Sequence, residues 1–252
     1  MSSPDCLDLG GGRRIAYHRT RAEGEGAGRP GVVFLGGFAS DMTGTKASFL
    51  EGWARERGRA FLRFDYTGHG ASSGVFEEGC VGDWAQDAED ALARLTEGPQ
   101  ILVGSSMGGW IALLLALRAP ERLAGIVGVA AAPDFTEDLI WARMSLVEQA
   151  LLMEAGRIER ETPYEEAPQI ISRRLILDGR ERLVLRDPLP LPCPLRLLHG
   201  TADTDVPERL AARLLHHVEQ PDARLILVKG ADHRFGGGGE LALIAETVEA
   251  LG

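Results

Sequence analysis

The serine at position 106 has the sequence context of an activated nucleophile. It lies at the centre of Gly104-Ser105-Ser106-Met107-Gly108, between an apolar run that predicts a strand and a run that predicts a helix. Glycines on both sides relieve the crowding of the tight turn that would expose the serine hydroxyl. The backbone N–H of Met107 would open the helix and could face a developing oxyanion. A small-residue turn without chemistry is the alternative, since such a motif can occur by chance in a chain with 32 glycines.

A carboxylate and a histidine that could activate this serine follow later in the chain. A serine hydroxyl is a weak nucleophile unless a base takes its proton and an acid orients that base. Asp203 follows a predicted strand at 194–198, and His233 follows a predicted strand at 224–228. We therefore predict a catalytic triad of Ser106 as nucleophile, His233 as base and Asp203 as acid. Because three separate strand ends agree, the turn-only interpretation of Ser106 becomes much weaker.

Neighbouring residues offer alternatives for these roles. Asp205 is the alternative acid, although its place before a predicted helix favours a helix cap. Asp232 directly precedes His233 and would point the other way in an extended segment. We expect Ser105 to pack or to form a hydrogen bond near the turn. The other histidines are predicted to be structural (His69, His199) or at the surface (His18, His216, His217).

A glycine-rich loop after the predicted strand 31–35 could supply a second oxyanion donor. Gly36 and Gly37 would let the backbone approach a bound carbonyl oxygen closely. We assign the donor to the backbone N–H of Phe38, with that of Met107 as the other. The donor could be one residue away, and a plain glycine turn is the alternative.

Short apolar runs alternate with helical patterns along the chain. This alternation predicts an α/β fold, with a mostly parallel central sheet and helices on both faces. The predicted strands lie near 13–19, 31–35, 60–64, 100–103, 125–130, 194–198 and 224–228, and the predicted helices near 45–57, 83–96, 107–118, 207–217 and 239–251. All the predicted chemistry follows strand ends, which is the edge of an open α/β sheet where ligands bind.

Residues 134–191 interrupt this alternation. We predict that they form a small cap inserted over the site, within a single domain of residues 1–252. Four apolar residues recur there at the spacing of one helix stripe: Ile140, Met144, Val147 and Leu151. The stripe could merely seal the cap onto the core. Alternatively, part of it could line an acyl pocket, where Met144 would adapt to a flexible chain.

Composition excludes several classes of protein. The net charge of −10, from 27 basic and 37 acidic residues, opposes binding of nucleic acid or of anionic lipid. Three widely spaced cysteines (Cys6, Cys80, Cys193) predict neither a disulfide framework nor a metal pair. The longest apolar run, Trp110 to Leu117, is far shorter than the roughly 20 residues of a membrane span. Since the N-terminus has a hairpin pattern in place of a signal peptide, we expect a soluble, cytoplasmic protein.

Four stretches of the sequence resemble a known family. They are Ser40–Ala47, Arg63–Gly70, Gly98–Trp110 and Cys193–Gly200. Together with the chain order Ser, Asp, His, they make the sequence similar to the α/β-hydrolases. Within that superfamily it resembles the mitochondrial palmitoyl-protein thioesterases, which are also described as acyl-glucuronide esterases. The resemblance implies the α/β-hydrolase fold, the triad named above, and hydrolysis of acyl thioesters or esters. It fades between about 134 and 191, so it does not define the substrate.

The residues therefore predict a serine hydrolase that acts through an acyl-enzyme intermediate. Its substrate would be a small-molecule or protein-linked acyl ester or thioester, and no cofactor and no metal are implied. Dehalogenase or epoxide-hydrolase chemistry would need a carboxylate at position 106 in place of Ser106. Two alternatives stay open. One is a general carboxylesterase with a cofactor-free haloperoxidase-type side activity, and the other is a non-catalytic binding protein, which would be expected to lack a triad member. The oligomeric state is also open.

Overall fold

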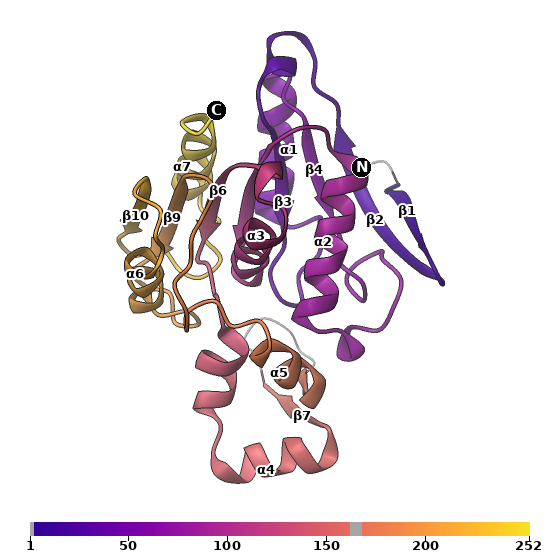
Figure 1. Cartoon of the computed structure of the whole chain (residues 1–252), viewed down its shortest axis with the longest axis vertical. Helices are drawn as coiled ribbons and strands as arrows, with labels where there is room; N and C mark the ends of the chain where they lie inside the picture. Colours follow the sequence, from indigo (N-terminus) through magenta and orange to yellow (C-terminus); the bar gives the residue numbers. More distant parts are fainter. Residues whose placement is uncertain (1–2, 162–167) are drawn as a thin grey trace.

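An eight-stranded, mostly parallel sheet forms the centre of the protein in the computed structural model, which describes residues 3–161 and 168–252 (Figure 1). The strand order is β1-β2-β4-β3-β5-β6-β9-β10. The strands are β1 (Asp5–Gly10), β2 (Arg13–Thr20), β3 (Gly31–Leu35), β4 (Phe61–Phe64), β5 (Gln100–Ser105), β6 (Leu123–Val129), β9 (Leu195–Gly200) and β10 (Ala223–Val228). Only β2 runs against the other strands of this sheet: it pairs antiparallel with β1 and β4, and all the other pairs are parallel. The predicted fold class is confirmed.

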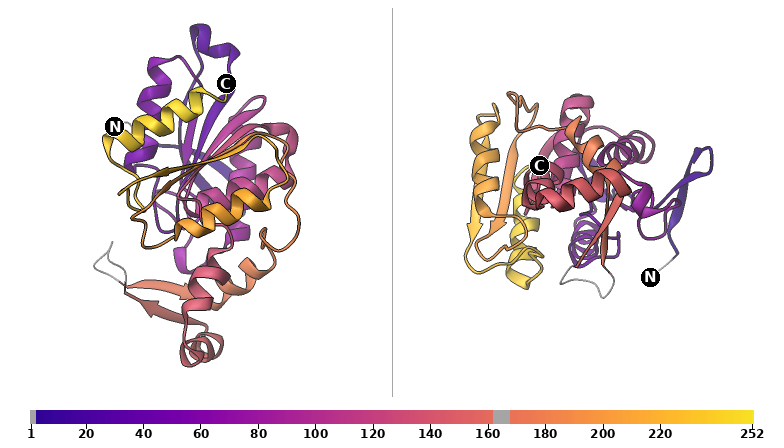
Figure 2. Two further views of the ribbon diagram at one scale, coloured as in Figure 1. Left: turned by 90° about the vertical axis from the view of Figure 1, so that its left-hand side faces the viewer. Right: turned by 90° about the horizontal axis from the view of Figure 1, so that it is seen from below.

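Helices cover both faces of the sheet, as Figure 2 shows from two further sides. They are α1 (Thr45–Glu56), α2 (Val81–Leu95), α3 (Met107–Arg118), α6 (Glu208–His217) and α7 (Gly238–Glu249). Each predicted strand and helix is present, with ends that differ by a residue or two. Among the described residues, no helix is both long and apolar enough to cross a bilayer.

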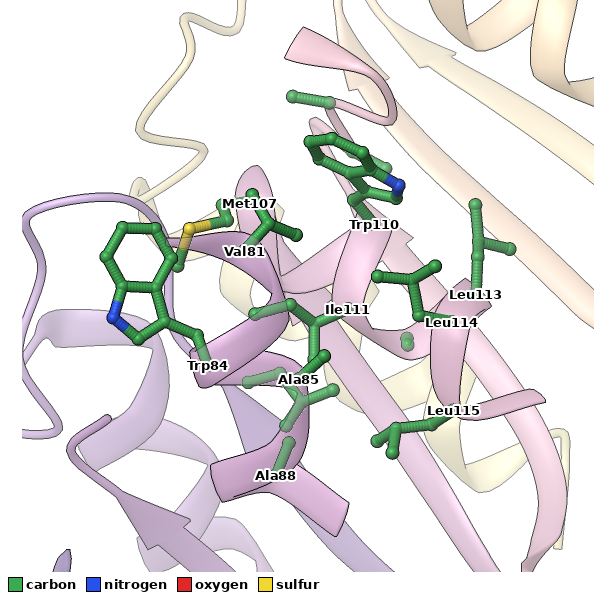
Figure 3. Close-up of a cluster of buried hydrophobic side chains, with 14 of the residues drawn as sticks. Val81, Trp84, Ala85, Ala88, Met107, Trp110, Ile111, Leu113, Leu114 and Leu115 are labelled. Atoms are coloured by element: carbon green, nitrogen blue, oxygen red, sulfur yellow. The ribbon is translucent and has the colours of Figure 1, made fainter. Parts of the chain in front are cut away.

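Two apolar cores lie on opposite faces of the sheet. One contains side chains of α1 and α7, and the larger contains those of α2, α3 and α6. In the larger core, Trp84 of α2 and Trp110 and Ile111 of α3 are fully buried (Figure 3). The first ten residues of α3, Met107 to Ala116, are all buried, which is why this helix is apolar on every side. Burial of each large apolar side chain stabilises the fold by about 1.5 to 3 kcal/mol, and here it holds α3 against the sheet.

The described elements of the cap segment (residues 134–191), from Thr136 to Arg180, lie beyond the carboxyl ends of the strands, at the bottom of Figure 1. They are a π-helical turn (Thr136–Ile140), a 3-10 turn (Trp141–Arg143), α4 (Leu146–Ala155), the antiparallel strands β7 (Arg157–Arg160) and β8 (Gln169–Ser172), and α5 (Arg173–Arg180). The chain therefore leaves the alternating pattern here. After α5 the chain returns along the sheet, where the carbonyl of Leu189 accepts the N–H of Glu219, just before β10.

The predicted single stripe along the cap is wrong. Met144 has an extended backbone (φ −75°, ψ 141°) that separates the turns before it from α4. Helix α4 starts anew behind a capping box, in which Ser145 and Glu148 exchange hydrogen bonds with each other's backbone. Met144 is buried, whereas Val147 and Leu151 are 77% and 52% exposed. These two residues therefore neither seal the cap nor line a pocket. The Ser-x-x-Glu spacing of Ser145 and Glu148 is the sequence signal that a new helix begins here.

Candidate active site

Ser106 occupies a strained turn between β5 and α3. Its backbone dihedrals are φ 52° and ψ −115°, in a region that residues other than glycine rarely adopt. The conformation is held from β6, because the Ser106 N–H donates to the carbonyl of Val129 at 2.9 Å. The Ser106 carbonyl in turn accepts the N–H groups of Gly109 and Ala132. This network holds the residue in place with its side chain lining a cavity.

The glycines around Ser106 are required by close packing. A Cβ atom at Gly104 would lie 2.4 Å from the carbonyl oxygen of Gly108, and one at Gly108 would lie 2.1 Å from that of Leu35. A Cβ atom at Gly109 would come within 2.5 Å of the Ala131 side chain. Any larger residue would therefore push α3 away from the sheet and displace the serine.

His233 and Asp203 meet at the ends of β10 and β9. The His233 Nδ1 atom lies 2.8 Å from Asp203 Oδ2, and since a carboxylate only accepts, Nδ1 carries the proton. The other carboxylate oxygen accepts the backbone N–H groups of Asp205 and Val206. Burial acts to raise the pKa of the Asp203 carboxyl, but the hydrogen bond and charge of His233, the N–H of Val206 and the nearby His199 together outweigh it, so this pKa is lower than usual. The carboxylate is thus ionised and aligned with His233.

The alternative acids have other partners. The Asp232 carboxylate accepts the N–H groups of Arg234 and Phe235 and so closes its own turn. Asp205 lines the cavity and donates its N–H to Asp203. Its predicted place as the helix cap is wrong, because Pro207, and not Asp205, is the residue that directly precedes α6. The geometry therefore pairs Asp203, and not its neighbours, with His233.

In the described part of the chain, one group of side chains resembles a metal site. Asp203, Asp205 and His233 each offer a ligand atom within 4.8 Å of the others. However, the Asp203 oxygens already accept N–H groups, and His233 Nδ1 faces one of them as a donor. A metal would have to displace these hydrogen bonds, so the donor set fits a hydrogen-bonded pair better than a cation.

The other histidines lie outside the cavity lining. His199 is fully buried, and its Nε2 lies 2.8 Å from the carbonyl oxygen of Val206 and 3.4 Å from Asp203 Oδ2. His199 thus contacts the carboxylate of Asp203. Its position at the end of a strand, four residues before Asp203, was a signal for this contact. Burial lowers the pKa of His69 to about 4, so His69 is neutral. His217 bonds to the carbonyl of Asp187.

The loop after β3, which we call the oxyanion loop (residues 36–42), lies directly beside Ser106. A Cβ atom at Gly37 would lie 3.5 Å from the Cβ of Ser106. Phe38 and Met107 both line the cavity. As the first residue of α3, Met107 has a backbone N–H with no partner within the helix. The structure therefore brings both predicted donor residues to the same cavity as Ser106 and His233.

The cavity has a volume of about 820 Å³, and apolar, cationic and acidic residues line it. The cap segment contributes apolar side chains: Phe135, Leu139, Ile140 and Ile171. Cationic side chains also line it: Lys46, Arg143, Arg160 and Arg234. Of the predicted stripe, only Ile140 belongs to this lining, so the acyl-pocket interpretation applies to that residue and not to the stripe.

Lys46 is expected to give the protein a pH-dependent stability. Burial, more than the nearby Arg234, lowers the pKa of its ammonium from 10.5 to about 8, while Asp232 partly opposes this shift. Between about pH 8 and 10.5 the unfolded chain binds the extra proton, so the free energy of unfolding should rise with pH in this window. The Lys46→Met variant should lack this rise and should melt a few degrees higher than the wild type at pH 7.

Melting temperatures of both proteins at several pH values from 7 to 10.5 test this expectation. The difference between them should be constant below about pH 8 and shrink above it. Parallel profiles over the whole range would show that the folded state does not disfavour the Lys46 ammonium.

Comparison with known proteins places the chain in a family. Residues 32–237 match the alpha/beta hydrolase family. The mitochondrial palmitoyl-protein thioesterase ABHD10 of Bos taurus is 34% identical over 256 residues, an alignment that covers 100% of this chain and 78% of that protein. The predicted resemblance to the palmitoyl-protein thioesterases is thus confirmed.

Two solved structures are similar over nearly their whole length. A putative hydrolase from Agrobacterium vitis S4 has a TM-score of 0.92 and 37% sequence identity, with 98% of this chain and 97% of that chain covered. Alpha/beta hydrolase domain-containing protein 10 from mouse has a TM-score of 0.90 and 33% identity, with 99% and 98% covered. By the sequence match, the shared fold and the arrangement of its strand ends, the chain belongs to the alpha/beta hydrolase family.

Proposed function

We propose that the protein is a serine hydrolase that cleaves acyl thioesters or carboxylic esters through an acyl-enzyme intermediate. The observation that supports this most is the 2.8 Å contact of His233 Nδ1 with the buried Asp203 carboxylate, in a cavity that Ser106 and His233 line together. With its Nδ1 proton committed to Asp203, the histidine has its Nε2 lone pair left to accept a proton. A base of that kind beside a serine is what acyl transfer requires.

In the acylation step, Ser106 Oγ attacks the acyl carbonyl carbon while His233 Nε2 accepts the hydroxyl proton. The carbonyl oxygen becomes an oxyanion, which the N–H groups of Phe38 and Met107 stabilise. The tetrahedral intermediate collapses, and the leaving thiol or alcohol takes the proton from His233. Water then attacks the acyl-enzyme by the same route in reverse, with His233 as base, and the carboxylic acid is released. Asp203 stabilises the imidazolium in both steps and keeps the tautomer correct.

The cavity supports an acyl substrate with an extended apolar portion. Phe135, Leu139, Ile140 and Ile171 form an apolar wall that the cap segment brings over the strand ends. A volume of about 820 Å³ accommodates a large ligand. The relatives named as palmitoyl-protein thioesterases are consistent with a long acyl chain on this wall. We therefore favour a small-molecule or protein-linked acyl thioester, with acyl-glucuronide and other carboxylic esters as alternatives.

A chain-length series tests this proposal. The substrates are one series of acetyl to palmitoyl thioesters of a single thiol, one series of oxyesters of a single alcohol, and an acyl glucuronide. We expect the highest kcat/KM with the longer thioesters. Ile140→Ser removes one apolar wall residue and should lower kcat/KM for long chains by about tenfold while sparing acetyl substrates. Val147→Ser is the matched control, because it changes an exposed residue of the same cap segment. Equal losses for short and long chains would place the acyl group elsewhere.

A further inference from the structure

Strand β4 and the residue that follows it contain buried charges that the proposed chemistry does not use. Arg63 and Asp65 are 3% and 2% exposed, and they belong to one of the stretches that resemble the family. A buried ionised group costs free energy unless hydrogen bonds and an opposite charge offset that cost. The partners of these two side chains therefore indicate what the charges do.

Both side chains hold the same residue of the oxyanion loop. The backbone N–H of Met42 donates to Asp65 Oδ1 at 2.6 Å, and the Met42 carbonyl accepts Arg63 Nη1 at 2.6 Å. Arg63 Nη2 also donates to the buried Glu51 of α1 at 2.6 Å, which balances its charge. The end of the oxyanion loop is thus fixed in both backbone groups by rigid, charge-assisted hydrogen bonds.

The second Asp65 oxygen is committed as well. Asp65 Oδ2 accepts the N–H of Ala71 at 2.8 Å. The backbone at Gly70 approaches so closely that a Cβ atom there would lie 2.2 Å from Asp65 Oδ2. Asp65 therefore joins the loop after β4 to the oxyanion loop through both of its carboxylate oxygens.

Residues that follow Asp65 in the chain also hold the start of the oxyanion loop. Tyr66 Oη donates to the Gly36 carbonyl at 3.4 Å. The Phe38 ring packs on Phe76 and Trp84, with centroid separations of 4.9 and 5.7 Å, and His69 contacts both of these rings. Phe38 is thus anchored by its side chain, while its backbone N–H stays at the cavity.

Between these anchors the oxyanion loop is strained. Ala39, directly after the proposed donor Phe38, has φ 56°, a conformation that costs about 1 to 3 kcal/mol for a residue with a Cβ and persists only if its surroundings impose it. A donor N–H must lie within roughly 0.5 Å of its productive position to stabilise an oxyanion fully. The loop therefore needs external restraint, and the bonds to Met42 supply it three residues beyond Ala39.

We infer that Asp65, together with Arg63, is a positioning residue that holds the oxyanion loop in the conformation that donates the Phe38 N–H. This inference rests on the proposed function, because it assumes that Phe38 donates to an oxyanion formed by Ser106. Its consequence concerns the transition state: loss of the Met42 bond lets the loop relax, so the oxyanion is bound less well, while the ground-state substrate is still held by the cavity walls.

The test is Asp65→Asn, which keeps the size of the side chain but replaces one accepting oxygen with an NH2 group. We expect kcat to fall by about 10- to 100-fold with KM nearly unchanged. The affinity for an alkyl trifluoromethyl ketone, which becomes an oxyanion when Ser106 adds to its carbonyl, should fall by the same factor. The affinity for the corresponding secondary alcohol, which forms no oxyanion, should not change.

Asp134→Asn is the matched control. The Asp134 carboxylate is also fully buried and also accepts two backbone N–H groups, those of Val184 and Leu185, but at the base of the cap segment. It should lose comparable stability while keeping the wild-type ratio of ketone to alcohol affinity. If Asp65→Asn also keeps that ratio, Asp65 is a fold-stabilising residue only and the inference is overturned.

A second variant covers the case in which Asp65→Asn does not fold. Arg63→Lys retains the charge but cannot reach both Met42 and Glu51 in the planar geometry of a guanidinium. The ratio of ketone to alcohol affinity should fall here too, and an unchanged ratio would again overturn the inference. If instead the wild-type protein hydrolyses neither thioesters nor carboxylic esters and binds the ketone no more tightly than the alcohol, the proposed function itself fails.

Discussion

Replacing Ser106 with alanine is expected to lower kcat by about 10⁴- to 10⁶-fold, because the residues of a triad act as a unit and no other nucleophile replaces the hydroxyl. The fold should survive. The bonds that hold this turn come from the Ser106 backbone, which donates to Val129 and accepts from Gly109 and Ala132, and alanine retains all of them. Steady-state turnover of the best acyl substrate and a melting curve measure the two effects.

A fluorophosphonate probe gives the matching chemical test. It should label the wild-type protein at Ser106 and leave the alanine variant unlabelled. Ser145→Ala is a suitable control, since Ser145 caps α4 and its loss should cost about 1 kcal/mol of stability without affecting labelling. Labelling that persists in the Ser106→Ala protein would assign the nucleophile to another residue and would remove the basis of the proposed mechanism.

The features of the fold that depend on local pattern could be predicted from the sequence. Parallel strands buried on both faces are continuous apolar runs, and the turn at Ser106 is marked by glycines that packing requires. Asp203 and His233 could be placed at strand ends because each follows such an apolar run. Their pairing depends on β9 and β10 lying side by side in parallel register, which the alternation of strands and helices implies but does not fix.

The features that depend on distant partners could not be predicted. Arg63 and Asp65 meet Met42 only because β4 lies beside β3 in the sheet, and no local spacing signals these bonds. The prediction of one helical stripe in the cap segment failed for a different reason. Ile140 and Val147 fit one helical period, but the extended backbone at Met144 breaks the helix, and periodicity cannot detect a break that preserves the spacing of apolar residues.

Asp203→Asn is expected to lower kcat by about 10³- to 10⁴-fold, because the amide NH2 would face His233 Nδ1 and favour the tautomer with its proton on Nε2. That tautomer cannot accept the Ser106 proton. Asparagine can still accept the N–H groups of Asp205 and Val206 with its remaining oxygen, so the loop after β9 should keep its shape. The effect should therefore appear in kcat, measured across pH, with little change in melting temperature.

Asp205→Asn separates the role of the pair from that of the loop. Asp205 lies two residues from Asp203 and lines the cavity, but its contact with Asp203 is made by its backbone N–H, which the substitution retains. We expect kcat to stay within about threefold of the wild-type value, a much smaller change than the loss of about 10³- to 10⁴-fold expected for Asp203→Asn. If Asp205→Asn instead caused the large loss and Asp203→Asn the small one, the acid would be Asp205, and the 2.8 Å contact of His233 with Asp203 would not be the catalytic one.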